Sequence, residues 1–417
     1  MATMLSASCV ANAQGNRALA NDDTLRLKLA EARALAISAN PQLRAQRLES
    51  KIAKAELQQA SVLFRANPSV DVLTRGPGTE IGVDQEIEIA GQRGARRAAA
   101  TAGVERAQAE ISDTTRLTLA AVDRTYFRLV SANEKALLSD EGRRLTERLA
   151  DAARRQLEAG KISKLEYNLS AVEQGRTRAR NLSANRDRER FASELRELLA
   201  LPPTKPVSPS APKALSDEPV RLDVDSLTII ALAQRPDLRE RAAAARQARS
   251  LASVARREAF PNLTLRASSE KTEGSQGRVL RPGIGLTLPI FNRNTGEINA
   301  RNAEAEMIDL QNRALALSIR IEISRAVQTY QSANAEARLL DSTVLTPARE
   351  NRQLLELAFR EGKVGLPVVL LIRSQVVDAE FEYWDAWLAA REALVDLRTA
   401  VGGEFVALPP DREMPRK

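Results

Sequence analysis

A chain of 417 residues could hold two or three ordinary domains, but its composition restricts what those domains can do. There is no histidine and only one cysteine, which removes the commonest general base, the commonest transition-metal ligand and any intramolecular disulfide. The net charge of +8 would suit nucleic acid or an anionic membrane, but arginines and glutamates alternate throughout, as on solvated helix faces. We therefore expect no catalytic residue, no metal site, no cofactor and no nucleic-acid partner.

The first thirteen residues resemble the end of a secretory signal peptide. Their apolar stretch is short and lacks a positively charged start, but Ala11-Asn12-Ala13 fits an A-x-A cleavage pattern. Cleavage there would begin the mature chain at Gln14 and remove Cys9. Lipidation of Cys9, a misplaced start codon and an unstructured cytosolic leader stay open as alternatives. The sequence holds no run of eighteen apolar residues, so no transmembrane helix is expected.

The chain is predicted to be an internal duplication. Pro41-x-Leu43 corresponds to Pro236-x-Leu238, and the motif "AGKI" at 159–162 corresponds to "EGKV" at 361–364. These landmarks lie about 200 residues apart and keep the same order in both halves, which chance similarity of alanine-rich helices does not explain. The predicted organisation is a leader remnant at 1–13, a first repeat at 14–200, a Pro/Ser-rich linker at 201–221, a second repeat at 222–403 and a C-terminal tail at 404–417.

Each repeat is predicted to be mostly helical. It starts with a helix that is interrupted at Asn40-Pro41 in the first half and at Arg235-Pro236 in the second. The longest helical stretches are expected at Gln92–Ala159 and Asn294–Glu361, each roughly 100 Å long, because a helix rises 1.5 Å per residue. A glycine turn and a returning helix follow each of them. Pro347 is expected to break or kink the second long stretch.

Two strands are predicted between the helices of each repeat, at about 68–75, 80–89, 261–269 and 280–291. Apolar and polar residues alternate along them, with Ile81, Val83, Ile87 and Ile89 on one face and Asp84, Glu86 and Glu88 on the other. In the last strand the apolar face runs from Ile284 to Ile290.

This alternation fits either hairpins that cover a soluble core or strands of a membrane β-barrel. Four strands cannot close a barrel, and lipid does not tolerate an open sheet edge. If the strands are in a membrane, several chains must therefore share one barrel, and three chains would supply twelve strands.

Several of these landmarks resemble a known family. The motifs concerned are the NP-x-L helix start, "LPIFNRNTGEI" at 288–298 and the paired glycine turns. Together with the duplication, they resemble the TolC-type outer-membrane efflux factors over about residues 25–403. Within that family, "QEIEIAGQRGARRAAA" at 85–100 is similar to the heavy-metal branch, the partners of cobalt-zinc-cadmium and copper-silver export systems.

The resemblance implies a mostly α fold with a small β-barrel portion, assembled as a homotrimer. A twelve-stranded barrel would lie in the lipid of the Gram-negative outer membrane, and a twelve-helix barrel would project into the periplasm. A periplasmic adaptor protein would be the direct partner and an inner-membrane pump of the resistance-nodulation-division (RND) class the indirect one. The protein would be a passive exit duct and not an enzyme. The expected cargo is heavy-metal cations, with drugs or other organic compounds as the alternative.

The resemblance also implies roles for individual residues. The tips expected to contact the adaptor are Gly160, Lys161, Ile162, Ser163, Gly362, Lys363, Val364, Gly365 and Leu366. TolC has aspartates just beyond the second tip, whereas this chain has the apolar segment "PVVLLIRSQ" there. We therefore expect an apolar constriction that gates by dewetting. The candidate gate residues are Glu166, Val368 and Leu371.

Two further sets of residues concern the barrel. Asp84, Glu86 and Glu88 could line its lumen and favour cations, although a solvated face explains the row equally simply. The passage from the barrel to the helical tunnel is expected at Pro289, Phe291, Asn292 and Gly296.

Two rival classes remain. A periplasmic adaptor or coiled-coil scaffold also contains long helical hairpins, but it has one hairpin where this chain has two matched halves. An enzyme would need a catalytic constellation, and no phosphate-binding loop or nucleophile–base pair is visible in the sequence. The sequence does not identify the cargo or the gating mechanism.

Overall fold

The computed structural model describes residues 24–403, except 76–77, 211–221, 272–276, 289, 292 and 362. The predicted leader at 1–13, the tail at 404–417 and the second half of the predicted linker lie outside the described residues. Pro289, Asn292 and Gly362, which belong to the expected barrel transition and the expected second tip, lie outside them too.

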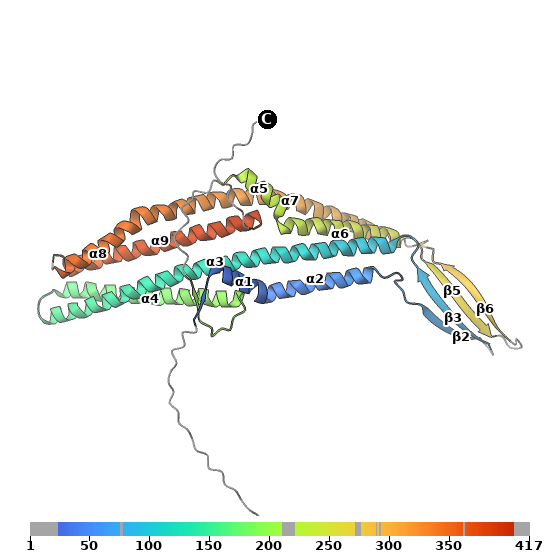
Figure 1. The fold of residues 1–417 in the computed structure, drawn as a ribbon, viewed down its shortest axis with the longest axis horizontal. Coiled ribbons are helices and arrows are strands. Elements are labelled where there is room, and N and C mark those ends of the chain that lie inside the picture. Colours follow the sequence, from blue (N-terminus) through green and yellow to red (C-terminus); the bar gives the residue numbers. More distant parts are fainter. Residues whose placement is uncertain are drawn as a thin grey trace, which may run out of the picture.

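The described chain is elongated, with a sheet at one end and two helical turns at the other (Figure 1). The first half contains β1 (Leu25–Leu27), α1 (Leu29–Ala39), α2 (Pro41–Ala60), β2 (Ser69–Arg75), β3 (Gly78–Ile87), α3 (Gln92–Glu158), α4 (Lys164–Leu198) and β4 (Val207–Pro209). The second half contains α5 (Val224–Gln234), α6 (Pro236–Glu258), β5 (Leu263–Lys271), β6 (Arg278–Leu286), α7 (Thr295–Leu340), the π-helical turn η1 (Asp341–Leu345), α8 (Thr346–Arg360) and α9 (Leu366–Val401).

The predicted interruptions of the first helices are confirmed. The side chain of Asn40 accepts hydrogen bonds from the backbone N–H groups of Gln42 (2.9 Å) and Leu43 (3.2 Å), and so caps α2, whose first residue is Pro41. Arg235 occupies the corresponding junction before α6. Its guanidinium donates to Asp237 and to the carbonyl of Ala400, which ties the junction to the end of α9.

The predicted long helices are observed, and Pro347 interrupts the second one as expected. α3 runs for 67 residues without a break. In the second half, α7 ends at Leu340 and the π turn η1 follows, with Pro347 at the second position of α8. Proline lacks the N–H that would continue the α-helical ladder, and the wider π turn accommodates that loss while the chain keeps its direction.

The four main strands form one antiparallel sheet in the order β2-β3-β5-β6, so a strand of each repeat meets at its centre. Two expected strand ends were placed too far along the chain. Ile89 leaves the ladder because β3 ends at Ile87, and β6 ends at Leu286, before Leu288 and Ile290. The Ile290 N–H donates to the Leu288 carbonyl (2.9 Å), which closes a tight turn in place of another strand residue.

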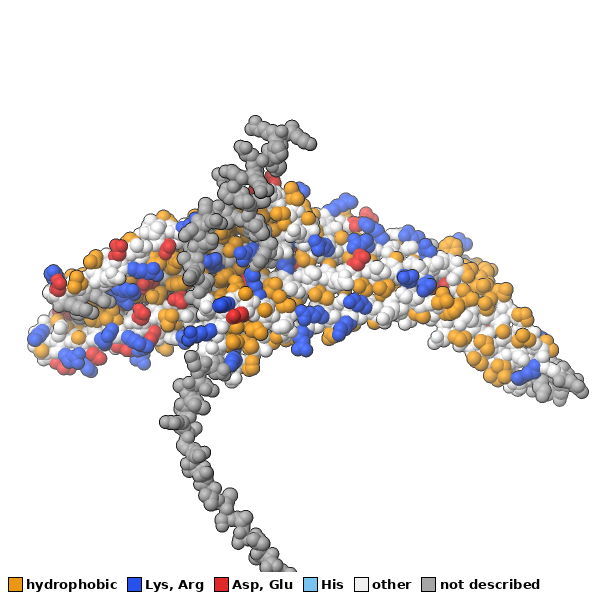
Figure 2. All heavy atoms as spheres, in the orientation of Figure 1, with side chains coloured by type: hydrophobic (Ala, Val, Ile, Leu, Met, Phe, Trp, Pro, Cys, Tyr) orange, Lys and Arg blue, Asp and Glu red, His pale blue; other side chains and the backbone are white. Residues whose placement is uncertain are grey.

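The predicted alternation holds for most of the sheet. Gln85 and Ser269 are exceptions on the apolar face, and Leu73 and Val279 are exceptions on the polar one. Register places the residues of one face as Val70, Val72, Ile81, Val83, Leu263, Leu265, Ala267, Leu280, Pro282, Ile284 and Leu286. The other face carries charged and small residues, namely Asp71, Gly82, Asp84, Arg266, Ser268, Arg281, Gly283 and Gly285. Hydrophobic side chains gather over this end of the molecule, whereas charges of both signs are scattered over the helices (Figure 2).

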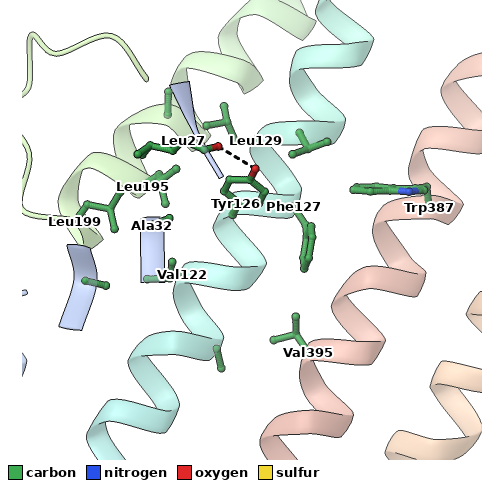
Figure 3. Packing of buried hydrophobic residues seen from close by; sticks show 14 of the residues in the cluster. Leu27, Ala32, Val122, Tyr126, Phe127, Leu129, Leu195, Leu199, Trp387 and Val395 are labelled. Atoms are coloured by element: carbon green, nitrogen blue, oxygen red, sulfur yellow. Dashed lines mark hydrogen bonds between the residues drawn. The ribbon is translucent and has the colours of Figure 1, made fainter. Parts of the chain in front are cut away.

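The largest apolar core lies at the middle of the molecule, where α1, α3, α4 and α9 meet (Figure 3). Tyr126 and Phe127 of α3 pack edge to face, and Phe127 packs in the same way on Trp387 of α9, at a centroid distance of 5.9 Å. The Tyr126 hydroxyl contacts the carbonyl oxygens of Leu27 (3.0 Å) and Ser210 (2.7 Å) beside the parallel pair β1–β4. We call this core, where α1, α3, α4 and α9 meet, the waist. It fixes the two repeats to each other.

The helices form a single curved layer on each side of the waist. Toward the sheet, the packing order is α2-α3-α6-α7, and toward the turns it is α4-α3-α9-α8. Within the residues that the structure describes, none of the helices combines the length and apolarity needed to cross a bilayer.

Candidate functional site

The first tip is the turn between α3 and α4, and its backbone is fixed by local hydrogen bonds. Gly160 has φ +70°, a left-handed conformation that glycine adopts without strain. The N–H of Lys161 donates to the carbonyl of Gln156 (2.8 Å) and that of Gly160 to the carbonyl of Leu157 (2.9 Å), the Schellman pattern of a helix end. Lys161 is exposed on this preformed turn, whereas Ile162 is half-buried.

Glu166, a candidate gate residue, lies in a capping box at the start of α4. The backbone N–H of Ser163 donates to Glu166 Oε2 (2.8 Å), and the N–H of Glu166 donates to Ser163 Oγ (3.2 Å). Hydrogen bonds from the backbone and hydroxyl of Ser163 lower the pKa of this carboxyl. Its carboxylate therefore stabilises the tip, and the S-x-x-E spacing in the sequence could have indicated this role.

The second tip lies between α8 and α9. The N–H of Lys363 donates to the Ala358 carbonyl (2.9 Å), and Gly365 caps α9, which begins at Leu366. Val364 does not protrude, since it packs on a small apolar cluster. The members of this tip cluster are Leu145 and Leu149 of α3, Val364, Leu355 of α8, and Val369, Leu370 and Ile372 of α9.

The apolar segment after the second tip is divided between two environments. Val369 and Leu370 are buried in the tip cluster, at 6% and 8% exposure. Val368 and Leu371, the candidate gate residues, point away from it and are 44% and 61% exposed in the single chain. Two apolar side chains one turn apart are thus presented on one face of α9 near the end of the molecule.

The predicted acidic row is divided among separate partners. The Arg266 guanidinium binds Asp84 with two hydrogen bonds (2.6 and 2.5 Å), and Glu86 accepts from the Asn262 amide (2.6 Å). Glu88 lies beyond β3 and pairs with Arg96 of α3. Asp84 and Glu88 are thus paired with arginines and Glu86 with a neutral amide, and the sequence did not predict the contribution of Arg266.

The junction between sheet and helices is built from left-handed residues and an arginine. Gly91 (φ +72°) precedes α3 and Asn294 (φ +57°) precedes α7, whose second residue is Gly296. Arg257 of α6 donates to the Gly91 carbonyl (3.0 Å). Phe291 is fully exposed in the single chain.

A column of acidic residues on α9, which the sequence did not reveal, joins the two halves from the level of the waist core toward the tips. Asp378, Asp385, Glu392 and Asp396 follow at spacings of seven, seven and four residues. Their partners all belong to the first repeat: Arg180 of α4 (2.8 Å), Lys135 of α3, Arg128 of α3 (2.6 Å) and Arg124 of α3 (2.6 Å). We call these four contacts the α9 ion-pair column.

Two ionisable residues of α9 are buried beside this column. Glu380 is only 4% exposed, and burial raises the pKa of its carboxyl although Arg352, Arg373 and Arg349 oppose the shift. Burial lowers the pKa of Arg391, whose guanidinium lies over the rings of Trp387 (5.3 Å) and Phe127. Neither position could be recognised from the sequence, because similar residues line the solvated faces.

Histidine, cysteine, aspartate and glutamate side chains do not gather in threes at metal-binding spacing in the described part of the chain. The larger hollows, such as one of about 400 Å³ between α1, α3 and α9, are open grooves between helices. The site is thus a set of surfaces: the tips, the face of Val368 and Leu371, and the sheet.

Comparison with known proteins gives a consistent result. Residues 228–403 match the family described as outer membrane efflux protein. The cobalt-zinc-cadmium resistance protein CzcC of Cupriavidus metallidurans is 26% identical over 379 residues, which cover 86% of this chain and 85% of the relative.

Solved structures extend the likeness in fold. The CusC channel superposes with a TM-score of 0.72 at 18% identity, over 91% of this chain and 94% of that one. The Campylobacter jejuni CmeC outer membrane channel gives 0.75 at 16% identity, over 91% and 86%. The chain therefore has the fold of the TolC-type outer-membrane efflux factors and, in residues 228–403, matches the sequence of the outer membrane efflux protein family.

Proposed function

We propose that the protein is the outer-membrane exit duct of a tripartite RND-type efflux system. The observation that carries this proposal is that sheet and helices form one continuous wall with two open edges. One edge consists of β2 and α2, and the other of β6 and α7. Copies of such a wall segment, joined edge to edge, enclose a passage.

The sheet has the surface that a lipid-embedded wall requires. Its apolar face is exposed in the single chain, at 75% for Ile284, 72% for Leu280 and 65% for Val70. A soluble protein rarely exposes a contiguous apolar face of this kind. The opposite face is mostly polar and contains glycines, as expected for the lumen of a membrane barrel.

The helical edges support a head-to-tail assembly. On α7, Met307, Leu310, Leu317 and Ile321 are exposed at heptad spacing, and on α2 Leu48 and Ile52 are exposed one turn apart. Contact of unlike edges is heterologous and closes only into a ring. Three copies would place twelve strands in one barrel, and we propose the homotrimer on that basis.

The tips are the proposed contact with a periplasmic adaptor. They lie at the end of the molecule opposite the sheet, and hydrogen bonds fix their backbone before any partner binds. Docking a preformed turn avoids part of the entropy cost of ordering a loop. The pump would then act through the adaptor, and this protein would conduct without chemistry of its own.

The proposed cargo is heavy-metal cations. This assignment is supported by the segment 85–100 and by the likeness to a cobalt-zinc-cadmium resistance protein. Organic compounds are the alternative. A strain that lacks the gene should lose tolerance to cobalt, zinc and cadmium, and expression of the gene should restore it. Loss of tolerance to dyes and antibiotics alone would favour the organic cargo.

Two measurements test the duct itself. Outer-membrane fractions should contain a heat-resistant band at three times the chain mass, and the purified protein should conduct ions in planar lipid bilayers. A soluble monomer in the periplasmic fraction would refute the proposal and favour an adaptor or scaffold. Genes for an adaptor and an RND pump beside this one would support the tripartite assignment.

A further inference from the structure

The junction between the sheet and the helices is rich in arginine. Three segments supply these arginines, namely Arg93, Arg96 and Arg97 at the start of α3, Arg256 and Arg257 at the end of α6, and Arg293 before α7. The Arg257 guanidinium donates to the Gly91 carbonyl (3.0 Å), and the Asn294 amide donates to the Ala255 carbonyl (3.0 Å). These contacts gather the three segments at one level of the molecule.

Two of these arginines are left with a free guanidinium. Acidic residues of the junction are already engaged by other arginines, in the ion pairs Glu88–Arg96, Glu258–Arg65 (3.0 Å) and Glu297–Arg301 (2.8 Å). Arg97 and Arg256, in contrast, are exposed and make no ion pair or hydrogen bond with the described residues. Their donors are therefore available to a ligand.

The side of α3 that follows the polar face of the sheet is marked by two contacts. Arg96 pairs with Glu88, and Gln92, one turn earlier, donates to Asn262 (2.9 Å). The Asn262 amide donates in turn to Glu86 on the polar face (2.6 Å). Arg96 and Gln92 therefore lie on the polar side of the helical layer.

Arg97 and Arg256 lie on the other side, which follows the apolar face of the sheet. Glu105 is nine residues, or two and a half turns, beyond Arg96 and so lies on the opposite side of α3. Arg97 precedes Glu105 by two steps of four residues, which keeps both within a quarter turn of each other. Glu105 pairs with Arg246 of α6 (2.7 Å), and Arg256 follows ten residues later on the same exposed side. Lys and Arg side chains adjoin the hydrophobic end in the space-filling view (Figure 2).

The depth of the two arginines matches the headgroup layer of a bilayer. β3 spans 10 residues, about 33 Å when extended, which a tilt of roughly 40° reduces to about the 25 Å of an apolar membrane band. Arg97 and Arg256 lie within about 10 Å of the helix ends that adjoin the sheet. Side chains of a helix point toward its N-terminus, so the Arg97 guanidinium extends back toward the sheet. A headgroup layer of roughly 5–8 Å follows the hydrocarbon on each side of a bilayer.

Assembly edge to edge leaves both arginines uncovered. On the sheet side of the waist, α3 and α6 are the middle helices of the layer, and α2 and α7 are its edges. Joined copies would cover α2 and α7, whereas the exposed sides of α3 and α6 would keep facing outward. Arg293 precedes the edge helix α7 and is left out of the site for that reason.

We propose that Arg97 and Arg256 bind the phosphate of an anionic phospholipid in the membrane leaflet nearest the helices. A guanidinium presents parallel N–H donors that match two phosphate oxygens. In a zwitterionic headgroup the ammonium offsets the phosphate charge, so an anionic lipid is attracted more strongly. Phe260, 61% exposed at the end of α6, offers apolar contact to the acyl chain. The inference rests on the proposed function, because it requires the sheet to lie in lipid, and it adds the lipid class that the wall selects.

The test measures which lipids the purified full-length protein holds in phosphatidylcholine vesicles. Spin-labelled phosphatidylglycerol and phosphatidylethanolamine report, by electron paramagnetic resonance, the fraction of each lipid immobilised at the protein. The wild type should hold phosphatidylglycerol in preference to phosphatidylethanolamine. Arg97→Gln combined with Arg256→Gln should lower the ratio of the two immobilised fractions by about twofold or more at low salt.

The matched control is Arg176→Gln combined with Arg178→Gln, which removes two exposed charges from α4 on the other side of the waist and should keep the wild-type ratio. Arg97→Lys combined with Arg256→Lys retains the charges and should retain the preference, which separates loss of charge from a disturbed fold. Inorganic phosphate should lower the ratio no more than chloride of equal ionic strength.

Three results would overturn the lipid site. They are an unchanged ratio in the glutamine pair, a loss in the lysine pair or the α4 control equal to that in the glutamine pair, and selective displacement of the lipid by inorganic phosphate. The last result would assign the two arginines to free phosphate.

The lipid site and the duct fail separately. Conductance in planar bilayers tests the duct, and the lipid ratio tests the two arginines. A wild-type protein that holds phosphatidylglycerol selectively through Arg97 and Arg256 but does not conduct would refute the duct and leave the lipid site standing. A conducting protein whose preference survives in the glutamine pair would refute the lipid site and leave the duct standing.

Discussion

Single side chains at the waist connect segments that are far apart in sequence. Tyr126 on α3 reaches the carbonyls of Leu27 and Ser210, and so holds the short pair β1–β4 against the helical layer (Figure 3). Burial, followed by the charge of Glu31, raises the pKa of the Tyr126 hydroxyl to about 12. The folded protein thus stabilises the protonated hydroxyl.

The contribution of Tyr126 to the free energy of unfolding should therefore decrease as the pH becomes alkaline. It is fully present below the unfolded pKa of about 10 and is lost as pH rises toward about 12. Tyr126→Phe leaves buried carbonyls without their hydroxyl contact and should lower the free energy of unfolding by about 1–3 kcal/mol at pH 7. Thermal unfolding measures this, and the gap between the two proteins should narrow above pH 10. A gap that is the same at pH 7 and pH 11 would contradict the assignment.

Glu380, unlike Tyr126, should destabilise the folded protein at neutral pH. Because burial raises the pKa of its carboxyl, the protonated form is favoured in the folded state, and stability falls as pH rises through the folded pKa. Glu380→Gln should therefore raise the melting temperature at pH 7.5 and make little difference below about pH 4.5. The exposed neighbour Glu382→Gln is the control and should change neither value. A lower melting temperature for Glu380→Gln at pH 7.5 would show that its arginine neighbours outweigh burial.

At the scale of helices, the two tips are built from similar motifs but present different surfaces. The first is closed by the capping box of Ser163 and Glu166, whereas in the second Val364 is half-buried on the tip cluster and Leu371 is exposed. Exposed apolar residues follow both tips, Leu165 and Leu169 after the first and Val368 and Leu371 after the second, so the constriction on the second hairpin stays a prediction.

We expect Val368 and Leu371 to line a dry constriction that excludes ions. Leu371→Asp should let water enter and raise the ion leak of the purified protein in lipid bilayers, and Leu371→Asn should do so without adding charge. Leu371→Met keeps the apolar surface and should retain the wild-type conductance. Equal conductance for all four proteins would mean that Leu371 does not line the narrowest point.

For the molecule as a whole, assembly should depend on the apolar edges. Leu317→Lys places a charge in the exposed heptad face of α7 and should abolish the heat-resistant trimer band in outer-membrane fractions. Ser318→Lys adds the same charge to the neighbouring exposed position and serves as the control. Assembly that survives Leu317→Lys but not Ser318→Lys would place the contact on a different face of α7.

Features set by local periodicity could be predicted from the sequence. The alternation of Ile81 and Val83 with Asp84, the length of α3 and the interruption at Pro347 all follow from neighbouring residues. Contacts between the halves could not be predicted in this way. Asp385 and Lys135 are 250 positions apart, and nothing near either residue distinguishes it from the other charges on the helices. The ends of β3 and β6 were also misjudged, because apolar alternation continues past the last ladder hydrogen bond at Ile89 and Leu288.

The pairing of β3 with β5 also has a consequence for the order of events during biosynthesis. Asp84 and Arg266, which meet across this pair, are 182 positions apart, so the centre of the sheet cannot form until most of the chain has been made. Before that, the chain has only the two-stranded hairpin of β2 and β3, which is marginally stable in water. The helical layer, rich in local contacts, should therefore form first. The protein would then arrive at its membrane with helices folded and the sheet still to be completed, and a chain terminated before β5 could not begin insertion.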